Sequence, residues 1–136
     1  MDLRYVLVVD DDAVTRAVVA KKLVKVAITI EAEDGVAAFR LLRQQRIDLI
    51  IVDLEMPNLG GIDLIGLVRG HPSTKHIPII VLTSDKSRDA FDQALQAGAT
   101  SFLNKPLNWQ AFGAHIIGNL VAVSRPTEMA MAKVIG

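Results

Sequence analysis

The sequence predicts an α/β protein with a doubly wound, parallel five-stranded sheet, in which each strand is followed by a helix. Two observations predict this class. Short apolar runs rich in β-branched residues recur along the chain without strict alternation, which is typical of strands buried on both faces. Segments with helical periodicity separate these runs. Regular alternation of this kind implies parallel strands, right-handed crossovers and helices on both faces of the sheet.

The composition fits one domain of ordinary size. The chain has 136 residues, of which 51% are hydrophobic, and no cysteine, which excludes disulfides and thiolate metal sites. Its 15 basic residues are balanced by 15 acidic ones, so direct binding of nucleic acid gets no support. No apolar run approaches the ~18 residues of a membrane span, and the N-terminus lacks a signal-peptide pattern. We therefore expect a cytoplasmic protein without a membrane partner.

The strands are predicted from the apolar runs at 5–9, 27–31, 48–52, 78–82 and 101–104. Pro78 fits the first position of a strand, where a missing N–H is tolerated. The helices are predicted at 13–25, 36–45, 62–69, 88–97 and 109–123. We expect one domain over 1–123. Residues 124–136 would be a C-terminal tail or the start of a linker.

Polar residues gather where the predicted strands end. The first strand runs into Asp10 and Asp11, the third into Asp53, the fourth into Thr83 and the fifth into Lys105. In open α/β sheets, ligands bind beyond the carboxyl ends of the strands. With the strand order 2-1-3-4-5, the first and third strands are neighbours about 5 Å apart. Their three aspartates would then share one pocket.

Three carboxylates in one pocket repel one another, so either some are protonated or a hard cation neutralises them. Mg²⁺ suits such oxygen ligands, with Mn²⁺ as the alternative ion. Lys105 adds a positive charge suited to phosphate, and Thr83 adds a hydroxyl donor. Together with a carboxylate nucleophile, these groups are typical of a phosphoryl-transfer centre.

At this point the sequence resembles the receiver domain of two-component response regulators, a signalling family with a flavodoxin-like fold and the strand order 2-1-3-4-5. The resemblance covers roughly residues 3–123. It rests on four motifs in order, each at a strand end: VVDD (8–11), VDLEMPNLGG (52–61), VLTS (81–84) and NKP (104–106).

The resemblance implies that Asp53 is the phosphoacceptor, which takes a phosphoryl group from a phosphohistidine donor in a His-Asp phosphorelay. Asp10 and Asp11 would bind Mg²⁺ together with Asp53, and Glu55 would add its backbone carbonyl. By resemblance the chain is a switch and not an enzyme with a substrate of its own. It would catalyse only its own phosphorylation and dephosphorylation.

The resemblance also implies roles for the fourth and fifth strands. Thr83 would form a hydrogen bond with the phosphoryl group, and Lys105 would pair with a phosphoryl oxygen. The Lys105–Pro106 peptide bond would be cis. Phe102 falls at the switch aromatic of the family. Its movement together with Thr83 would reshape the surface formed by the fourth helix, fifth strand and fifth helix.

Four residues around these motifs have further expectations. Asp12 is interpreted as the N-cap of the first helix. By resemblance, Glu55, Ser84 and Asp85 lie at positions that tune how fast the aspartyl phosphate is hydrolysed. We hypothesise that the acidic pair, Glu55 and Asp85, makes the pocket rim more negative and slows attack on small anionic donors.

Two helices are expected to meet partners. The first helix carries basic residues, Arg16, Lys21 and Lys22 among them, and by resemblance it would contact a sensor histidine kinase or a histidine phosphotransfer protein. The fifth helix has no charged residue, so its outer side is expected to meet a second protomer, the C-terminal tail or an output domain.

Two alternatives to a stand-alone switch remain open from the sequence. VVDDDAVT (8–15) also fits the opening of haloacid-dehalogenase-like phosphatases, with Asp10 as nucleophile and Asp12 as general acid. That family needs further acids after the lysine, whereas 106–136 holds only Glu128, and Asp53 would stay unexplained. The chain could also be the receiver part of a longer regulator.

Overall fold

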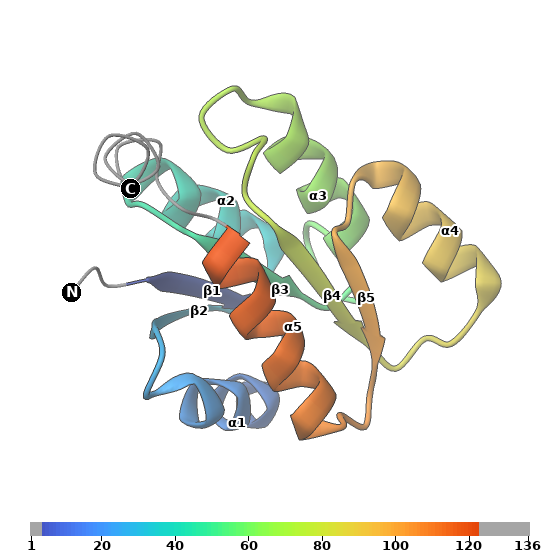
Figure 1. The fold of residues 1–136 in the computed structure, drawn as a ribbon. Helices are drawn as coiled ribbons and strands as arrows, with labels where there is room; N and C mark the ends of the chain where they lie inside the picture. The colour runs from blue at the N-terminus through green and yellow to red at the C-terminus, as the bar shows by residue number, and fades with distance from the viewer. Residues whose placement is uncertain (1–3, 123–136) are drawn as a thin grey trace.

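A computed structural model describes residues 4–122, and the side chains to 120. Strands and helices alternate through the whole of this range, as the sequence predicts (Figure 1). The strands are β1 (Tyr5–Val9), β2 (Ile28–Ala32), β3 (Leu49–Val52), β4 (Ile79–Thr83) and β5 (Ser101–Asn104). The helices are α1 (Ala13–Leu23), α2 (Gly35–Gln44), α3 (Gly61–Gly70), α4 (Arg88–Ala97) and α5 (Trp109–Ala122).

The five strands form one parallel sheet in the order β2-β1-β3-β4-β5, which confirms the predicted topology. Several boundaries differ by one or two residues from those predicted. The strand β2 begins at Ile28 because the N–H groups of Val26 and Ala27 bond back to Leu23 and close the turn after α1. The strand β4 extends to Thr83, which pairs with Asn104. The helix α2 begins at Gly35, directly after its cap Asp34.

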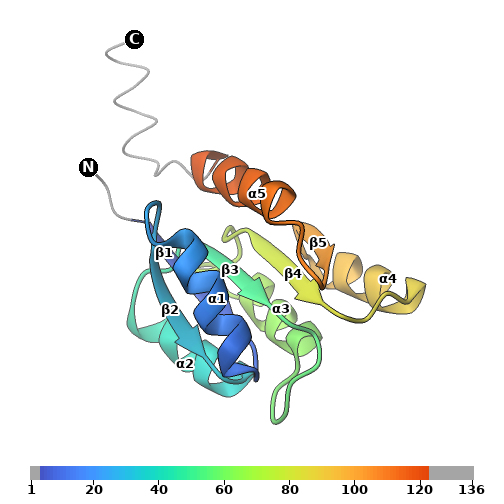
Figure 2. The same cartoon turned by 90° about the horizontal axis from the view of Figure 1, so that it is seen from below.

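Helices cover both faces of the sheet (Figures 1 and 2). On one face, α1 and α5 pack Val19, Leu23, Phe112 and Ile116 against strand residues such as Ile51. On the other face, α2, α3 and α4 pack against the alternate strand residues. The strand β3 is buried throughout, which explains its uninterrupted apolar sequence.

Side-chain caps fix where helices begin at the carboxyl end of the sheet. Asp12 accepts from the N–H of Val14, Asp34 from Ala37 and Ser87 from Ala90, so orphan donors of α1, α2 and α4 are satisfied. The predicted capping role of Asp12 is thus observed. These three helices therefore leave the sheet from defined points beside the strand ends.

The predicted division into a domain over 1–123 and a tail over 124–136 stays a prediction, because its boundary lies outside the described residues. Within the described range, no helix is long and apolar enough to cross a membrane.

Candidate phosphoryl-transfer site

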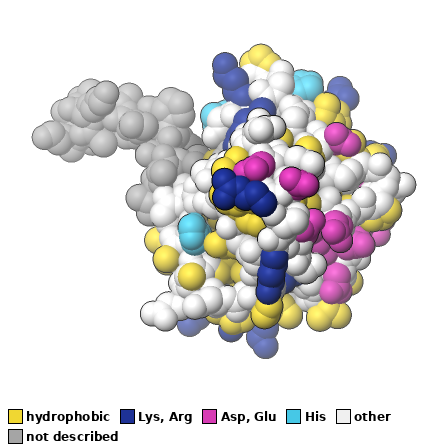
Figure 3. Space-filling view, turned by 90° about the vertical axis from the view of Figure 1, so that its right-hand side faces the viewer, with side chains coloured by type: hydrophobic (Ala, Val, Ile, Leu, Met, Phe, Trp, Pro, Cys, Tyr) yellow, Lys and Arg dark blue, Asp and Glu magenta, His cyan; other side chains and the backbone are white. Residues whose placement is uncertain are grey.

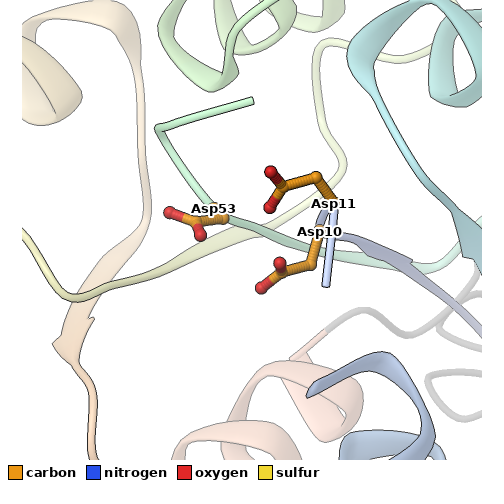
Figure 4. Close-up of side chains that lie close together, drawn as sticks. All are labelled: Asp10, Asp11 and Asp53. Carbon is orange, nitrogen blue, oxygen red and sulfur yellow. The ribbon is translucent and has the colours of Figure 1, made fainter. Parts of the chain in front are cut away.

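Three carboxylates meet at the ends of β1 and β3 (Figure 4). Val9 pairs with Val52, and the N–H of Asp53, directly after β3, donates to the carbonyl of Val9 at 3.0 Å. One oxygen from each of Asp10, Asp11 and Asp53 lies within 4.8 Å of the others. Asp10 is 3% exposed and Asp53 8%, whereas Asp11 is exposed. The predicted convergence of these three residues is observed.

Lys105 supplies the positive charge between two of these carboxylates. Its Nζ lies 2.8 Å from Oδ2 of Asp10 and 3.1 Å from Oδ2 of Asp53. Partial burial favours the neutral amine, but the hydrogen bonds to the two carboxylates outweigh this effect and raise the pKa of Lys105 above its usual value. With this raised pKa, the lysine stays charged over the whole physiological range of pH. The Lys105–Pro106 peptide bond is cis.

The donor set fits a hard divalent cation. Three carboxylates offer oxygen ligands, and one positive charge, that of Lys105, faces two of them. This leaves excess negative charge in a small, largely buried space, which Mg²⁺ or Mn²⁺ would neutralise. Cysteine and histidine are absent from the cluster, so it does not resemble a zinc site.

Thr83 closes the neighbouring side of the site. It is fully buried at the end of β4, and its Oγ1 accepts from the N–H of Asp85 at 3.2 Å. The side-chain amide of Asn104 donates to the carbonyls of Thr83 and Asp85 and so holds the loop after β4. Ser84 is exposed. Sequence reasoning did not assign a role to Asn104, although its place at a strand end was noted.

Phe102 lies on β5, on the side of α4. Its ring meets that of Phe91 edge-on, with the centroids 5.3 Å apart, and the side chain is half-buried. Both rings line a hollow below the start of α4, together with Lys86, Arg88 and Asn104. The predicted switch residue is therefore in contact with the helix that it would influence.

The loop after Asp53 carries Glu55, which is exposed. Its N–H donates to Oδ1 of Asp53 at 3.3 Å. The far end of the loop is tied to α2, because the side-chain amide of Asn58 donates to Asp34 at 2.7 Å. This contact is not predicted by the sequence. The only signal was the Asp-Gly pair at 34–35, which is typical of a turn or cap.

Arg16 of α1 points inward. Its guanidinium donates to the backbone carbonyl of Asp10 at 2.6 Å and to the carboxylate of Glu31 at 3.1 Å, and its side chain is 16% exposed. Of the basic residues predicted to meet a donor, Arg16 is thus largely used within the molecule. Lys21 and Lys22 are exposed, and Nζ of Lys22 lies 5.2 Å from the ring centroid of Trp109.

An apolar groove of about 210 Å³ runs from the site along α1 to the start of α5. Its lining includes Val14, Val18, Lys105, Leu107 and Trp109. Val14 is 70% exposed and Val18 40%, so this side of α1 presents apolar surface to the groove. The groove therefore leads from Lys105, at the carboxyl end of the sheet, to the surface between α1 and α5.

The surface around the site is acidic. Figure 3 shows Asp and Glu side chains gathered on one side of the view, with Lys and Arg side chains mainly beside them. The exposed acidic residues that follow the strands are Asp11, Asp12, Glu33 and Glu55. The carboxylate of Asp85 accepts from the N–H of Ser87, a contact that lowers its pKa. Glu55, like Asp11 and Glu33, is therefore an acidic rim residue whose carboxylate has no such contact among those observed.

Comparison with known proteins gives one consistent answer. The family model of the response regulator receiver domain matches residues 6–117. The chain is 34% identical over 107 residues to the chemotaxis protein CheY of Pseudomonas aeruginosa, which covers 77% of this chain and 86% of that protein. It is 33% identical over 103 residues to CheY-3 of Vibrio cholerae, with 74% and 79% covered.

Solved structures agree with the sequence matches. The fold is similar to that of chemotaxis protein CheY4 of Vibrio cholerae, with a TM-score of 0.79, 30% identity, and 85% of this chain and 97% of that chain covered. It is also similar to the signal receiver domain of a histidine kinase from Syntrophus aciditrophicus, with a TM-score of 0.84, 29% identity, and 90% and 93% covered.

Proposed function

Because this chain belongs to the family of response regulator receiver domains, we propose that it is a phosphoacceptor switch in which Asp53 takes a phosphoryl group from a phosphohistidine donor. One observation carries the proposal. Asp53 lies at a strand end within 4.8 Å of two further carboxylates, and Lys105 bridges it to one of them. A lone aspartate before a turn would need neither arrangement.

In the proposed reaction, a carboxylate oxygen of Asp53 attacks phosphorus while the bond from phosphorus to the imidazole nitrogen of the donor breaks. The electron pair of that bond stays on the imidazole nitrogen. Lys105 would pair with one phosphoryl oxygen, and the Thr83 hydroxyl would donate to another after releasing the Asp85 N–H. Asp10, Asp11, Asp53 and the backbone carbonyl of Glu55 would hold Mg²⁺ or Mn²⁺, which neutralises phosphoryl charge when bound.

The donor is proposed to dock on α1. The groove beside α1 ends at Lys105, so a helix lying in it would reach the site, and its apolar lining would pack against an apolar helix face. Lys21 and Lys22 lie on the same helix and would select an acidic flank. This chemistry suits a sensor histidine kinase or a histidine phosphotransfer protein.

The signal is proposed to leave through α4, β5 and α5. Movement of Thr83 toward a phosphoryl group would pull on the loop that leads into α4, where Phe102 contacts Phe91. On α5, Ile117 is 55% exposed and Trp109 36%, and no charged residue accompanies them. A second protomer or an output domain would cover this helix. The predicted contact with the tail falls outside the described residues.

The contacts of Asp12 do not favour the alternative of a haloacid-dehalogenase-like phosphatase. It needs Asp12 as a general acid, but Asp12 caps α1 by accepting from Val14 and Thr15. Membership of the receiver family also makes the chain a signalling switch in place of a metabolic enzyme. The cytoplasmic location, and whether the chain works alone or within a longer regulator, stay predictions.

Intact mass spectrometry tests the proposal. The chain is incubated with Mg²⁺ and a small phosphodonor, and with Mg²⁺ and a phosphorylated histidine phosphotransfer protein. We expect the mass of one phosphoryl group to be added to the wild type and not to Asp53→Asn. An unmodified wild type in both reactions would contradict the proposal.

A further inference from the structure

The loop from Leu54 to Gly60 is fastened to α2 at its far end. The amide of Asn58 donates to Oδ2 of Asp34 at 2.7 Å, and the N–H of Gly35 donates to the carbonyl of Leu59 at 3.1 Å. A Cβ at Gly35 would lie 2.4 Å from that carbonyl oxygen, so only glycine permits this approach. Two adjacent residues of each segment thus form one junction.

The Asp34 side of this junction is rigid. Asp34 is 9% exposed, and its other oxygen, Oδ1, accepts from the N–H of Ala37 in the first turn of α2. The backbone N–H of Ala37 and then the amide of Asn58 lower the pKa of Asp34. The carboxylate is therefore a charged acceptor whose orientation is set by a helix.

On the other side of the junction, the side-chain amide is the reason for an asparagine at position 58. Asn58 has a φ of 67°, in the left-handed region where glycine is the residue of lowest strain. Glycine there would give the same backbone without the amide. Asparagine tolerates this region better than most side chains, and it adds a donor that reaches Asp34.

The near end of the loop is held as tightly. The N–H of Gly61 donates to the carbonyl of Leu54 at 3.1 Å, and a Cβ at Gly61 would lie 2.4 Å from the carbonyl oxygen of Asp53. Glu55 lies between the two fastened ends. Its backbone therefore has little freedom as long as both ends stay fastened.

We infer that Asp34 and Asn58 are positioning residues for the divalent cation: their hydrogen bond holds the loop so that the backbone carbonyl of Glu55 stays available as a ligand beside Asp53. The inference rests on the proposed function, because it assumes that Glu55 contributes this carbonyl. Neither Asp34 nor Asn58 belongs to the carboxylate cluster itself. Partners that orient metal ligands in this way typically change metal affinity by ~10-fold to ~100-fold when they are removed.

Three variants of the full chain separate the hydrogen bond from the backbone. Asn58→Gly keeps the left-handed backbone and removes only the amide, so we expect Mg²⁺ to bind about tenfold more weakly. Asn58→Asp places a second carboxylate against Asp34 and should weaken binding at least as much. The exchange Asp34→Asn with Asn58→Asp restores an amide–carboxylate pair, and asparagine also caps helices well, so it should recover most of the affinity.

Asp48→Asn is the matched control. Asp48 is another buried aspartate, 5% exposed, which accepts from the N–H of Tyr5 at the opposite end of the sheet. The Asp48→Asn substitution should lower the stability of the fold without changing the affinity for Mg²⁺. Far-UV circular dichroism confirms that each variant is folded before titration, and Asn58→Gly decides if Asn58→Asp does not fold.

Isothermal titration with Mg²⁺ alone gives a clear decision. Weakened binding in Asn58→Gly, recovery in the exchange variant and unchanged binding in Asp48→Asn would support the inference. Unchanged binding in a folded Asn58→Gly variant, while the wild type binds Mg²⁺, would overturn the inference and leave the proposed function intact. A wild type that binds no Mg²⁺ would overturn both.

Discussion

Replacing Lys105 with methionine removes the one cation that faces Asp10 and Asp53 among the described residues. Breaking a buried ion pair from one side costs about 3–5 kcal/mol, and breaking an exposed one less than about 1 kcal/mol. The side chain of Lys105 is 24% exposed, against 4% and 10% for its partners. We therefore expect a loss of roughly 2 kcal/mol without Mg²⁺. In a domain of this size that is a fall in Tm of roughly 8 °C.

Mg²⁺ should repair much of this loss, because the lysine and the metal neutralise the same carboxylates. Coulomb's law gives about 4 kcal/mol for two unit charges 4 Å apart near a protein surface. Salt and the mobility of the lysine reduce this repulsion, and we expect about 1.4 kcal/mol. That amount is a tenfold tighter Kd for Mg²⁺ in Lys105→Met. At saturating Mg²⁺ the Tm gap should then close by more than half.

Thermal unfolding with and without saturating Mg²⁺, followed by circular dichroism, measures both effects in one series. Lys75→Met serves as the control, since Lys75 is exposed. We expect Lys75→Met to match the wild type in both conditions. A Mg²⁺-induced rise in Tm that is no larger in Lys105→Met than in the wild type would refute the reasoning.

Three further predictions follow from other contacts. Arg69→Met should lower the free energy of unfolding in urea by roughly 3 kcal/mol, because the guanidinium makes part-buried bonds to the carbonyls of Gly98 and Ile77, each worth about 1.5 kcal/mol or more; a loss below about 0.5 kcal/mol would contradict it. Hydrogen bonds lower the pKa of Asp34, so its contribution to stability is complete above 3.8, the ordinary pKa of an aspartate, and is lost as pH falls through the lower pKa of the folded state. Acid unfolding of Asp34→Asn, compared with the wild type, should therefore show less dependence on pH below 3.8. Glu55→Asn should speed phosphorylation by small anionic donors, and unchanged phosphorylation and decay rates in Glu55→Asn and Asp85→Ala would rule out the rim hypothesis.

The convergence of Asp10, Asp11, Asp53 and Lys105 could be predicted because parallel strands bring their carboxyl ends to one edge of the sheet. The position of each residue along its strand was then enough to place it. Asp12 could be assigned as a cap for a similar reason, since its role depends on residues two and three positions away.

Contacts between distant loops could not be predicted in this way. The bond from Asn58 to Asp34 joins residues 24 positions apart, and it depends on a left-handed turn that no periodicity reveals. Arg16 was expected to contact a partner protein, but its long side chain reaches back to a carbonyl six residues earlier. Both contacts depend on the path of the backbone between elements, which the pattern of apolar residues does not encode.

The contacts of Asn104 bear on whether the proposed conformational change is gradual or two-state. Its amide holds two carbonyls on either side of Ser84, and the N–H of Lys105 holds the first of them as well. Displacing that loop would break the bond from Asn104 to Asp85, and moving Thr83 with it would break the other two, which would favour two discrete positions over a continuous shift. The output of the chain would then be all-or-none in each molecule. A graded cellular response would reflect how many copies have switched and not how far each has moved.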